Sequence, residues 1–352
     1  MTLVFTGDNA MNIVDLERTT KELLAEGKGI LAADETPETL TKRFAQLKIP
    51  STPDSRRAYR EIFFTTPDVA ESISGVIMQD ETIRQKSSAG RPFADVLIQN
   101  GIVPGIKVDT GAKGLAGRPG ESITEGLDGL RDRLKEYRQI GARFAKWRAV
   151  LHIADGFPTS TCIRANAHAL ARYAALCQEQ GVVPIVEPEV LMDGPHTIRR
   201  CEEVTGDVLQ ATMDALFEHS VSFEGMLLKP NMIVAGKEAQ RRASVQEVAL
   251  CTLRCLRRLV PAAVPGIVFL SGGQDALTAT AHLNAINQLN GPQPWTLSFS
   301  FGRALQDEAL QEWQGKPENV QSAQNAFSHR ARCVSAAAAG NYIDAMEEDL
   351  AA

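Results

Sequence analysis

Short apolar runs alternate with longer amphipathic stretches from one end of the chain to the other, and this alternation restricts the folds open to it. Eight runs have the length and β-branched content of buried strands, at 29–34, 73–78, 104–109, 143–148, 184–190, 225–231, 266–273 and 296–303. Helical patterns lie between them, such as those at 127–140, 160–178, 198–217, 244–259 and 275–289. Strands that alternate with helices form a parallel sheet. A closed eight-stranded barrel and a doubly wound open sheet both fit, and periodicity alone does not choose between them.

Residues near the predicted helix ends support this α/β reading. Ser244 followed by Glu247 fits a capping box, in which each side chain satisfies a free backbone donor of the first turn. Gly141 and Gly181 stand where a helix ends before the next strand begins. A first helix is predicted at about 12–25, after a start that lacks the basic and apolar regions of a secretory signal.

The rest of the chain shows no division into parts. The glycine-rich stretch 111–120 follows the third strand and is predicted to be a long βα loop. We therefore expect residues 1–352 to form a single domain.

The net charge of -6 argues against nucleic acid as the main partner. No apolar run is long enough to cross a membrane. The six cysteines are scattered, and Cys251 and Cys255 lack a second pair that would complete a zinc site, so reduced thiols in the cytoplasm are expected.

Ionisable residues gather near the C-terminal ends of the predicted strands. They are Asp34, Lys107, Asp109, Lys146, Arg148, Glu187, Glu189, Lys229 and Arg303. Buried parallel strands normally read as continuous apolar runs, so these charges are unusual. In an eight-stranded barrel the strand ends converge on one mouth, and residues two apart on a strand share a face. A salt-bridge lattice that only neutralises itself is the alternative, but burying so much charge is costly without a functional return.

Lys229 is the candidate nucleophile among these residues. It lies in the apolar run LLKPN, where Pro230 favours an extended backbone at the strand end. Pro188 likewise predicts that the fifth strand ends there. Burial and a neighbouring ammonium group, for which Lys146 is the candidate, both disfavour the charged form of a lysine. At about 4 Å and an effective dielectric constant near 20, two like charges repel by roughly 4 kcal/mol, or about three pKa units before nearby carboxylates are counted.

A phosphate site is predicted after the last two strands. The segments LSGGQD and FGRAL each place glycine between a strand and a helical stretch. Glycine lets backbone N–H groups approach an oxyanion, and helix N-termini favour negative charge. Ser271 supplies a hydroxyl donor, and the Arg303 guanidinium suits phosphate oxygens. Loops after strands seven and eight of a barrel are a frequent phosphate site.

At these residues the sequence resembles the class I fructose-1,6-bisphosphate aldolases. EGMLLKPNM, at 224–232, is similar to that family's Schiff-base lysine segment, and GILAADE, the Lys107 strand, KWR, PIVEPEVL, FLSGGQ and SFSFGRALQ match in the same order. The resemblance extends from about Asp15 to Tyr342. It implies a (β/α)8 TIM barrel with an N-terminal helix and a C-terminal helical tail, and so favours the closed barrel over the open sheet.

The resemblance also implies roles for the residues at the strand ends. Lys229 would attack the ketone of a sugar bisphosphate, and Glu187 would move protons as the imine forms. Lys146 would stabilise charge, and Glu189 would orient the lysine. Asp34 would accept the C4 hydroxyl proton as the C3–C4 bond breaks, which releases triose phosphates in glycolysis or supports their condensation in gluconeogenesis.

The resemblance implies one group of residues for each phosphate of the substrate and two further residues that line the pocket. For the C1 phosphate they are Ser271, Gly272, Gly302 and Arg303; for the C6 phosphate they are Lys107, Thr36 and Thr39; Arg43 and Arg148 would line the pocket. Family members often carry serine where this chain has its two threonines. No cofactor and no metal are implied, and the family is commonly homotetrameric.

The C-terminus departs from the animal members of the family, which end in a tyrosine that assists proton transfer. This chain ends MEEDLAA, and Tyr342 would substitute only if the tail folds over the mouth. Three alternatives to fructose-bisphosphate cleavage by an imine are the same chemistry on another ketose phosphate such as sedoheptulose bisphosphate, a metal-dependent aldolase, and an idle barrel that acts as a binding scaffold. The six histidines show no pair at ligand spacing near a strand end, which disfavours the metal-dependent enzyme.

Overall fold

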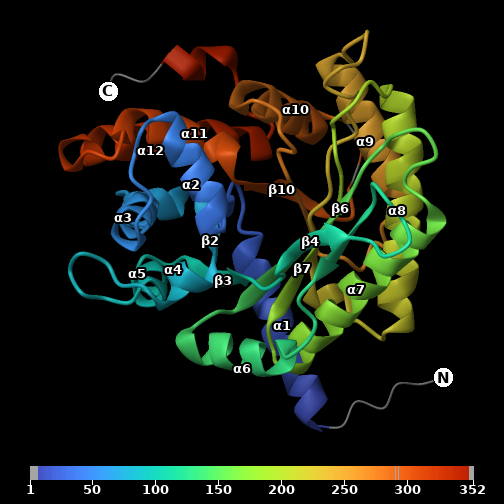
Figure 1. Cartoon of the computed structure of the whole chain (residues 1–352), viewed down its shortest axis with the longest axis horizontal. Coiled ribbons are helices and arrows are strands. Elements are labelled where there is room, and N and C mark those ends of the chain that lie inside the picture. The colour runs from blue at the N-terminus through green and yellow to red at the C-terminus, as the bar shows by residue number, and fades with distance from the viewer. Residues whose placement is uncertain (1–6, 290, 292, 349–352) are drawn as a thin grey trace.

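Eight parallel strands close into a barrel in the computed structural model, which describes residues 7–289, 291 and 293–348 (Figure 1). The strands are β1 (Gly29–Ala33), β2 (Ile73–Met78), β3 (Val103–Lys107), β6 (Phe144–Leu151), β7 (Val183–Val190), β8 (Leu227–Leu228), β9 (Gly266–Phe269) and β10 (Thr296–Phe301). Their order around the barrel is β1-β10-β9-β8-β7-β6-β3-β2. All eight predicted strands are therefore confirmed, and the open sheet is excluded.

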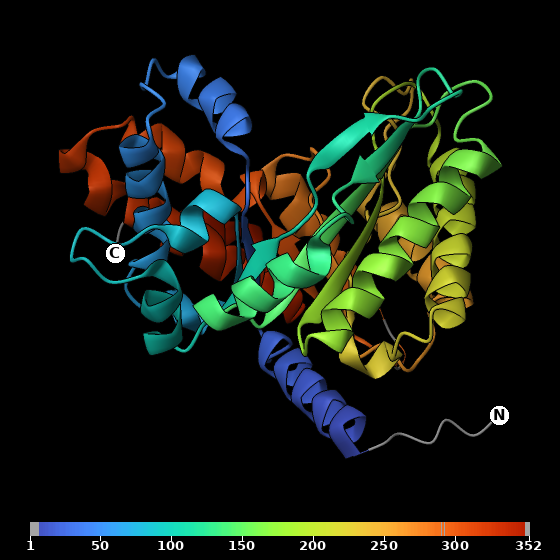
Figure 2. The same cartoon turned by 60° about the horizontal axis from the view of Figure 1, so that its bottom comes forward.

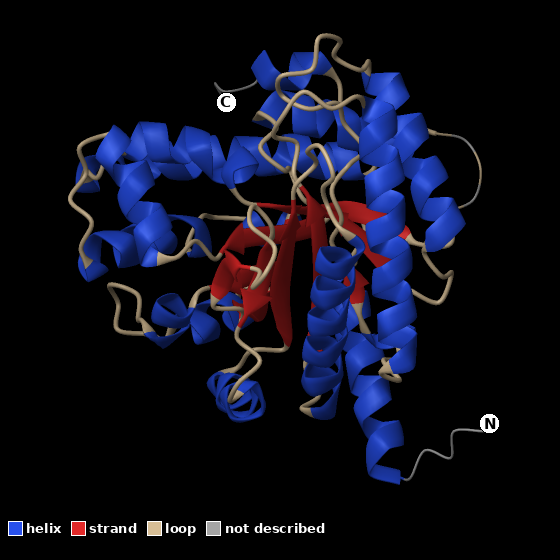
Figure 3. Ribbon diagram, turned by 45° about the vertical axis from the view of Figure 1, so that its right-hand side comes forward, coloured by secondary structure: helices blue, strands red, loops and turns tan. Residues whose placement is uncertain are grey.

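Helices cover the outside of the barrel and its N-terminal end (Figure 3). They are α1 (Gly7–Leu23), α2 (Pro37–Gln46), α3 (Pro53–Phe64), α4 (Asp80–Arg84), α5 (Phe93–Gln99), α6 (Leu130–Ile140), α7 (Ser160–Glu179), α8 (Ile198–Glu218), α9 (Val245–Leu259), α10 (Ala276–Gln288), α11 (Arg303–Trp313) and α12 (Val320–Ala338). A 3-10 helix at Asp344–Glu348 follows α12. The five predicted helices and the N-terminal helix are confirmed, although α1 begins at Gly7, earlier than predicted. The first six residues of the predicted lead into it lie outside the described residues.

Only half of the predicted capping box forms at the start of α9. The Ser244 hydroxyl accepts a hydrogen bond from the Glu247 backbone N–H at 3.2 Å, as predicted. The Glu247 carboxylate turns instead to Arg241, whose Nη2 lies 2.9 Å from its Oε2. An ion pair competes successfully for the carboxylate because it adds charge to the hydrogen bond. Gly141 and Gly181 have φ values of 121° and 65°, so both end helices as predicted.

The stretch predicted as a plain loop after β3 contains a β-hairpin. β4 (Gly111–Gly114) and β5 (Ser122–Glu125) pair antiparallel in a sheet of their own, outside the barrel (Figure 2). The hairpin is anchored at Thr124, whose hydroxyl donates to the Arg148 backbone oxygen at 2.8 Å. The glycine-rich composition concealed the strands, because their pairing depends on this tertiary contact as well as on local propensity.

Helix α1 packs against the N-terminal end of the barrel interior. Its residues Leu16 and Leu23 are buried in one apolar cluster with inward residues of the strands, including Phe144 and Ile185. Close approach of the helix requires glycine on the strands: a Cβ on Gly266 would lie 2.3 Å from Cδ2 of Leu24. The end of the barrel opposite the charged strand ends is thus filled with hydrocarbon.

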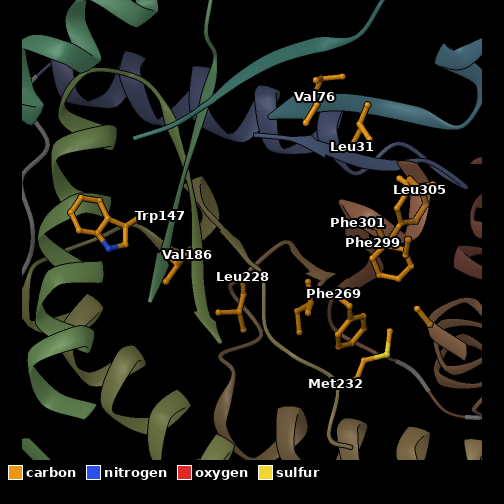
Figure 4. Close-up of a cluster of buried hydrophobic side chains, with 14 of the residues drawn as sticks. Leu31, Val76, Trp147, Val186, Leu228, Met232, Phe269, Phe299, Phe301 and Leu305 are labelled. Carbon is orange, nitrogen blue, oxygen red and sulfur yellow. The ribbon is translucent and has the colours of Figure 1, made fainter. Parts of the chain in front are cut away.

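The outward faces of the strands form a second apolar layer beneath the helices. Figure 4 shows Leu31, Val76, Trp147, Val186, Leu228, Phe269, Phe299 and Phe301 from the strands, with Met232 and Leu305 from the segments that follow them. Every one of these side chains is buried. Because both faces of each strand are covered, the strands need apolar residues at nearly every position, which explains their continuous apolar runs.

β7 runs through Pro188, so the prediction that it ends there is wrong. Ala149 of β6 pairs with Pro188, and Val150 and Leu151 pair with the two residues after it. The backbone N–H of Lys229 donates to the Val186 oxygen, which fixes the even-numbered residues of β7 as those facing β8. On that side β8 ends at Leu228, so the missing N–H of Pro188 faces no strand and costs no ladder bond.

No helix within the described residues has the length and apolar content required to cross a membrane.

We expect Gly266→Ala to destabilise the fold by about 1–3 kcal/mol, the usual cost of overpacking a core, because Leu24 must move away from the new methyl group. Denaturant unfolding at equilibrium would measure this. Gly114→Ala is the matched control, since a Cβ there meets nothing within 4 Å. Equal stability of the two variants would contradict the packing of α1 described above.

Candidate active site

The inward faces of β6, β7 and β8 change from apolar to charged towards their carboxyl ends. Ile185 lies in the interior cluster with α1, and the next inward residue of β7 is Glu187. The same two-residue step leads from Leu227 to Lys229 and from Phe144 to Lys146. Because side chains two apart share a face, one strand register places hydrocarbon below and ionisable groups above.

A lattice of two lysines and two carboxylates occupies this upper layer. The Lys146 Nζ atom lies 2.6 Å from Oδ2 of Asp34 and 3.2 Å from Oε2 of Glu187. The Lys229 Nζ atom lies 3.3 Å from Oε1 of the same glutamate. Glu187 is thus shared between two ammonium groups contributed by β6 and by the residue after β8. The four predicted residues come together, each at least nine-tenths buried except Asp34, whose side chain is 12% exposed.

The pKa of Lys229 falls below its ordinary value. Burial is the main cause, and the neighbouring ammonium of Lys146 lowers the pKa further, while Glu187 and Asp34 act against the shift. Burial alone would also lower the pKa of Lys146, but the carboxylates of Asp34, Glu187 and Asp109 outweigh burial and raise it. The two lysines therefore divide into one cation that stays charged and one amine that loses its proton more readily.

Both carboxylates of the lattice are held in their ionised form. Burial would raise the pKa of Asp34, but Lys146 and Lys229 more than reverse this, so its pKa lies well below the ordinary range. The pKa of Glu187 is lowered in the same way, with Lys146 as the largest opposing influence to burial. An ionised carboxylate beside a substrate hydroxyl can accept its proton.

Two further ion pairs flank the lattice. Arg148 pairs through Nε with Oε2 of Glu189, and Lys107 pairs through Nζ with Oδ1 of Asp109 at 2.6 Å. Asp109 also accepts from the Arg148 backbone N–H at 3.3 Å, so it joins β3 to β6. Glu189 had been expected to orient Lys229, yet the carboxylate that contacts Lys229 is Glu187. The two-residue spacing of Lys107 and Asp109 predicts that their side chains share the inward face, and the structure pairs them.

The segment that carries Asp34 is clamped by its neighbour Glu35. Oε2 of Glu35 accepts from Nη1 of Arg60 at 2.7 Å, and Oε1 accepts from Nη1 of Arg43. Arg43 also donates to Tyr59 at 3.1 Å and to Asp307 at 2.8 Å. The Arg43 guanidinium, predicted to line the pocket, is therefore engaged in a network between α2, α3 and α11 that positions the Asp34 segment.

Thr36 and Thr39 lie at the start of α2, directly after this segment. The Thr36 hydroxyl accepts from the Thr39 N–H at 3.3 Å and lies 3.2 Å from the Thr39 hydroxyl. Thr36 is the N-cap of the helix, a position that threonine and serine both fill well. The predicted pair is brought together, and the two hydroxyls are adjacent to each other.

The glycine-rich segments after β9 and β10 meet above the lattice. A Cβ on Gly272 would lie 4.0 Å from Oε1 of Glu189, and one on Gly273 would lie 3.6 Å from Nη2 of Arg303. Gly302 precedes α11 as its N-cap and lacks a side chain to cap the helix. Arg303 is exposed. The backbone N–H groups at the start of α11 and the Arg303 guanidinium are available to an anion.

The Ser271 segment is braced by a pair of polar residues that sequence reasoning missed. Gln274 donates through its backbone N–H and through Nε2 to the Ser271 backbone oxygen, at 3.0 Å in each case. Its Oε1 lies 2.6 Å from Nδ1 of His282 on α10. Burial lowers the pKa of His282 to about 4, so this ring is neutral near pH 7 and donates from Nδ1. His282 reaches Gln274 only through the packing of α10, so no sequence motif predicts this contact.

Tyr342 lies against α10 and α12. Its backbone N–H donates to Oδ1 of Asn284, its backbone oxygen accepts from Nδ2 of the same residue, and its hydroxyl donates to Glu347 at 2.8 Å. These contacts hold Tyr342 beside α10 and the segment after α12.

Within the described residues, His329, Cys333 and Glu347 form a group with metal-ligand atoms within 4.8 Å of one another. That group lies on α12 and the segment after it, where Arg330 also binds Glu347, and it takes no part in the lattice.

The closed barrel with its charged mouth is a TIM barrel of the kind that carries enzymes. A model of glycolytic class I fructose-bisphosphate aldolase matches residues 15–352. A probable fructose-bisphosphate aldolase class 1 from Xanthomonas campestris pv. campestris is 54% identical over 333 residues, which cover 94% of this chain and 99% of the relative. The cytosolic fructose-bisphosphate aldolase 4 of Arabidopsis thaliana is 53% identical over 316 residues, which cover 90% of this chain and 80% of the relative.

A solved structure extends the likeness to three dimensions. The co-crystal structure of fructose-bisphosphate aldolase from Plasmodium falciparum, in complex with TRAP and a small-molecule inhibitor, has a TM-score of 0.93 at 48% identity and covers 95% of this chain and 96% of its own. The chain therefore belongs to the class I fructose-bisphosphate aldolase family and is a lyase of that kind.

The lowered pKa values of Asp34 and Glu187 predict a loss of stability in acid. Because their folded-state values lie below the ordinary 3.8 and 4.5, their ionisation stabilises the fold above about pH 4.5, and this contribution is lost as the pH falls towards the folded-state values. We expect Asp34→Asn to reduce the acid slope of the unfolding free energy by up to about 1.4 kcal/mol per pH unit. Denaturant melts between pH 3 and pH 6 would measure the slope, and an unchanged slope would contradict the lattice.

Proposed function

We propose that the enzyme cleaves fructose 1,6-bisphosphate reversibly into dihydroxyacetone phosphate and glyceraldehyde 3-phosphate through an imine at Lys229. The observation that carries the proposal is the buried Lys229 amine with a lowered pKa, 3.3 Å from Glu187. A neutral amine has the lone pair that attack on a ketone requires, whereas an ammonium has none. The family membership of the chain supports the same reaction.

Glu187 and Lys146 serve the formation of the imine. The amine adds to the C2 ketone to give a carbinolamine, and loss of that hydroxyl as water leaves a positively charged imine. Glu187 contacts both lysines, so its ionised carboxylate can first accept the proton that the attacking amine loses and then donate that proton to the departing hydroxyl. Lys146 stays charged and stabilises the negative charge that develops on the reacting oxygen.

Asp34 serves the cleavage of the carbon–carbon bond. Its ionised carboxylate accepts the proton of the C4 hydroxyl, and the C3–C4 electron pair moves into the imine, which becomes a neutral enamine. The C4 hydroxyl becomes the aldehyde of glyceraldehyde 3-phosphate. Protonation of the enamine at C3 and hydrolysis then release dihydroxyacetone phosphate and restore Lys229. The Glu35 clamp keeps Asp34 beside Lys146 throughout.

The two ends of the substrate fit two groups of residues. Ser271, Gly272, Gly302 and Arg303 hold the C1 phosphate near the start of α11, where a helix N-terminus favours anions. Lys107, with the hydroxyls of Thr36 and Thr39, serves the C6 phosphate, and Arg148 holds Glu189 beneath the Gly272 segment. No cofactor takes part in these steps.

We further infer that the enzyme works in glycolysis and gluconeogenesis, in the cytoplasm, and as a homotetramer. Two Arabidopsis relatives are described as cytosolic, and the matching family is described as glycolytic. Exposed apolar side chains on the outer helices, such as Phe217 at 76% and Leu250 at 54%, suit contacts between subunits. Light scattering after gel filtration measures the subunit number directly.

Reduction with borohydride in the presence of dihydroxyacetone phosphate tests the imine. We expect one reduced adduct per chain, located at Lys229 by peptide mass, and loss of both the adduct and the cleavage activity in Lys229→Met. Lys316→Met, at an exposed loop position, is the matched control and keeps both. An adduct at another lysine, or normal cleavage by Lys229→Met, would overturn the proposal.

Lys107→Met tests which end of the substrate Lys107 meets. We expect the KM for fructose 1,6-bisphosphate to rise at least tenfold, as for loss of one charge-assisted hydrogen bond of about 1.5–3 kcal/mol. Fructose 1-phosphate lacks the C6 phosphate, so its KM should change little. Steady-state kinetics on the two sugars measure the ratio, and equal effects on both would contradict the assignment.

A further inference from the structure

The segment after β8 returns to the mouth of the barrel alongside the segment after β7. Three backbone N–H groups of residues 236–238 donate to carbonyl oxygens of residues 192–196, at 2.7, 2.8 and 3.1 Å. The packing is so close that a Cβ on Gly236 would lie 2.0 Å from the Gly194 oxygen. Position 237 is therefore fixed by the backbone, and its side chain starts from a defined point.

The side chain at this position is a lysine that reaches the phosphate-binding segments. A Cβ placed on Gly273 would lie 3.1 Å from Nζ of Lys237 and 3.6 Å from Nη2 of Arg303. The ammonium and the guanidinium thus come from two different strand ends and lie against the same glycine. Gly273 has a φ of 85°, so the turn itself also requires glycine. A phosphate at the Ser271–Gly273 turn can contact both cations, because each has donors to spare.

Within the described residues, Lys237 pairs with the carboxylate of Asp193. Its Nζ lies 3.0 Å from Oδ1 of Asp193, and the two side chains are 43% and 57% exposed. An ion pair this exposed contributes little to stability, since water and salt screen it. A doubly charged phosphate offers the ammonium more negative charge and more acceptor oxygens than one carboxylate. The Asp193 carboxylate therefore competes weakly with the phosphate for the same cation.

We propose that Lys237 is a substrate-binding residue that adds a second cation to the C1-phosphate site, and that Asp193 weakens this contact by competing for Lys237. The inference rests on the proposed function and extends it, since it names residues beyond Ser271, Gly272, Gly302 and Arg303. Lys237 touches the phosphate and not the reacting carbons, so it acts on substrate binding and leaves the chemical step unchanged.

Two substitutions with opposite effects test the proposal. Lys237→Met is expected to raise the KM about tenfold for fructose 1,6-bisphosphate and for fructose 1-phosphate alike, with little change in kcat, because both sugars carry the C1 phosphate. Asp193→Asn is expected to lower both KM values about two- to fivefold, because it frees Lys237. The double variant should match Lys237→Met. Lys316→Met is the charge-matched control and leaves all values unchanged.

The opposite signs separate a phosphate contact from a structural ion pair. If the pair served only to hold the two segments together, both substitutions would remove it and change the KM in the same direction, which would overturn the proposal. An unchanged KM in Lys237→Met, or a rise for the bisphosphate alone, would overturn it as well. Trapping of the imine at Lys229 in the same variants keeps the two questions apart: an adduct that forms normally while the KM fails to respond refutes only the role of Lys237, whereas an adduct absent from the parent enzyme refutes the proposed function.

Discussion

One buried carboxylate, that of Glu187, lies between two lysine ammonium groups, and the rest of the site is arranged around this contact. Burial penalises every charge in the lattice, and the ions remain only where an opposite charge compensates. Lys146 is compensated by two carboxylates and stays protonated, whereas Lys229 shares a single carboxylate with it and has a lowered pKa. The unequal sharing of carboxylates is what makes the two lysines chemically different.

The interior of the barrel is divided into layers, and this division lets the fold contain a lattice of buried charges. Leucines of α1 and apolar strand residues fill one end, where burial of hydrocarbon stabilises the fold. The ionisable residues then occupy the next inward positions, which the two-residue period of the strands supplies automatically. Outside the barrel, the buried Arg60 and its partner Glu35 fix the segment that carries Asp34. Rigidity around the charges keeps the distances within the lattice short.

Much of this arrangement can be predicted from the residues, and the exceptions have physical causes. The eight strands and the inward pairs follow from local periodicity, and the lattice of Asp34, Lys146, Glu187 and Lys229 follows once the strands are closed in a barrel. Pro188 was misleading because its cost depends on which neighbour it faces, and β8 ends before reaching it. Contacts between distant segments produce three features: the β4–β5 hairpin, the hydrogen bond of Arg43 to Asp307, and the approach of Lys237 to Gly273. No local pattern in the sequence encodes those contacts.

The charge of Lys146 lowers the pKa of the Lys229 amine, and the pH dependence of imine trapping measures this effect. Initial rates of cyanoborohydride adduct formation with dihydroxyacetone phosphate, measured at Lys229 by peptide mass across pH, give the apparent pKa of the amine. Replacing Lys146 with methionine removes the repelling cation and leaves Glu187 less compensated, so we expect this pKa to rise by about one unit or more, or ~1.4 kcal/mol. An apparent pKa that is unchanged or lower in Lys146→Met would show that Lys146 does not repel the charge of Lys229.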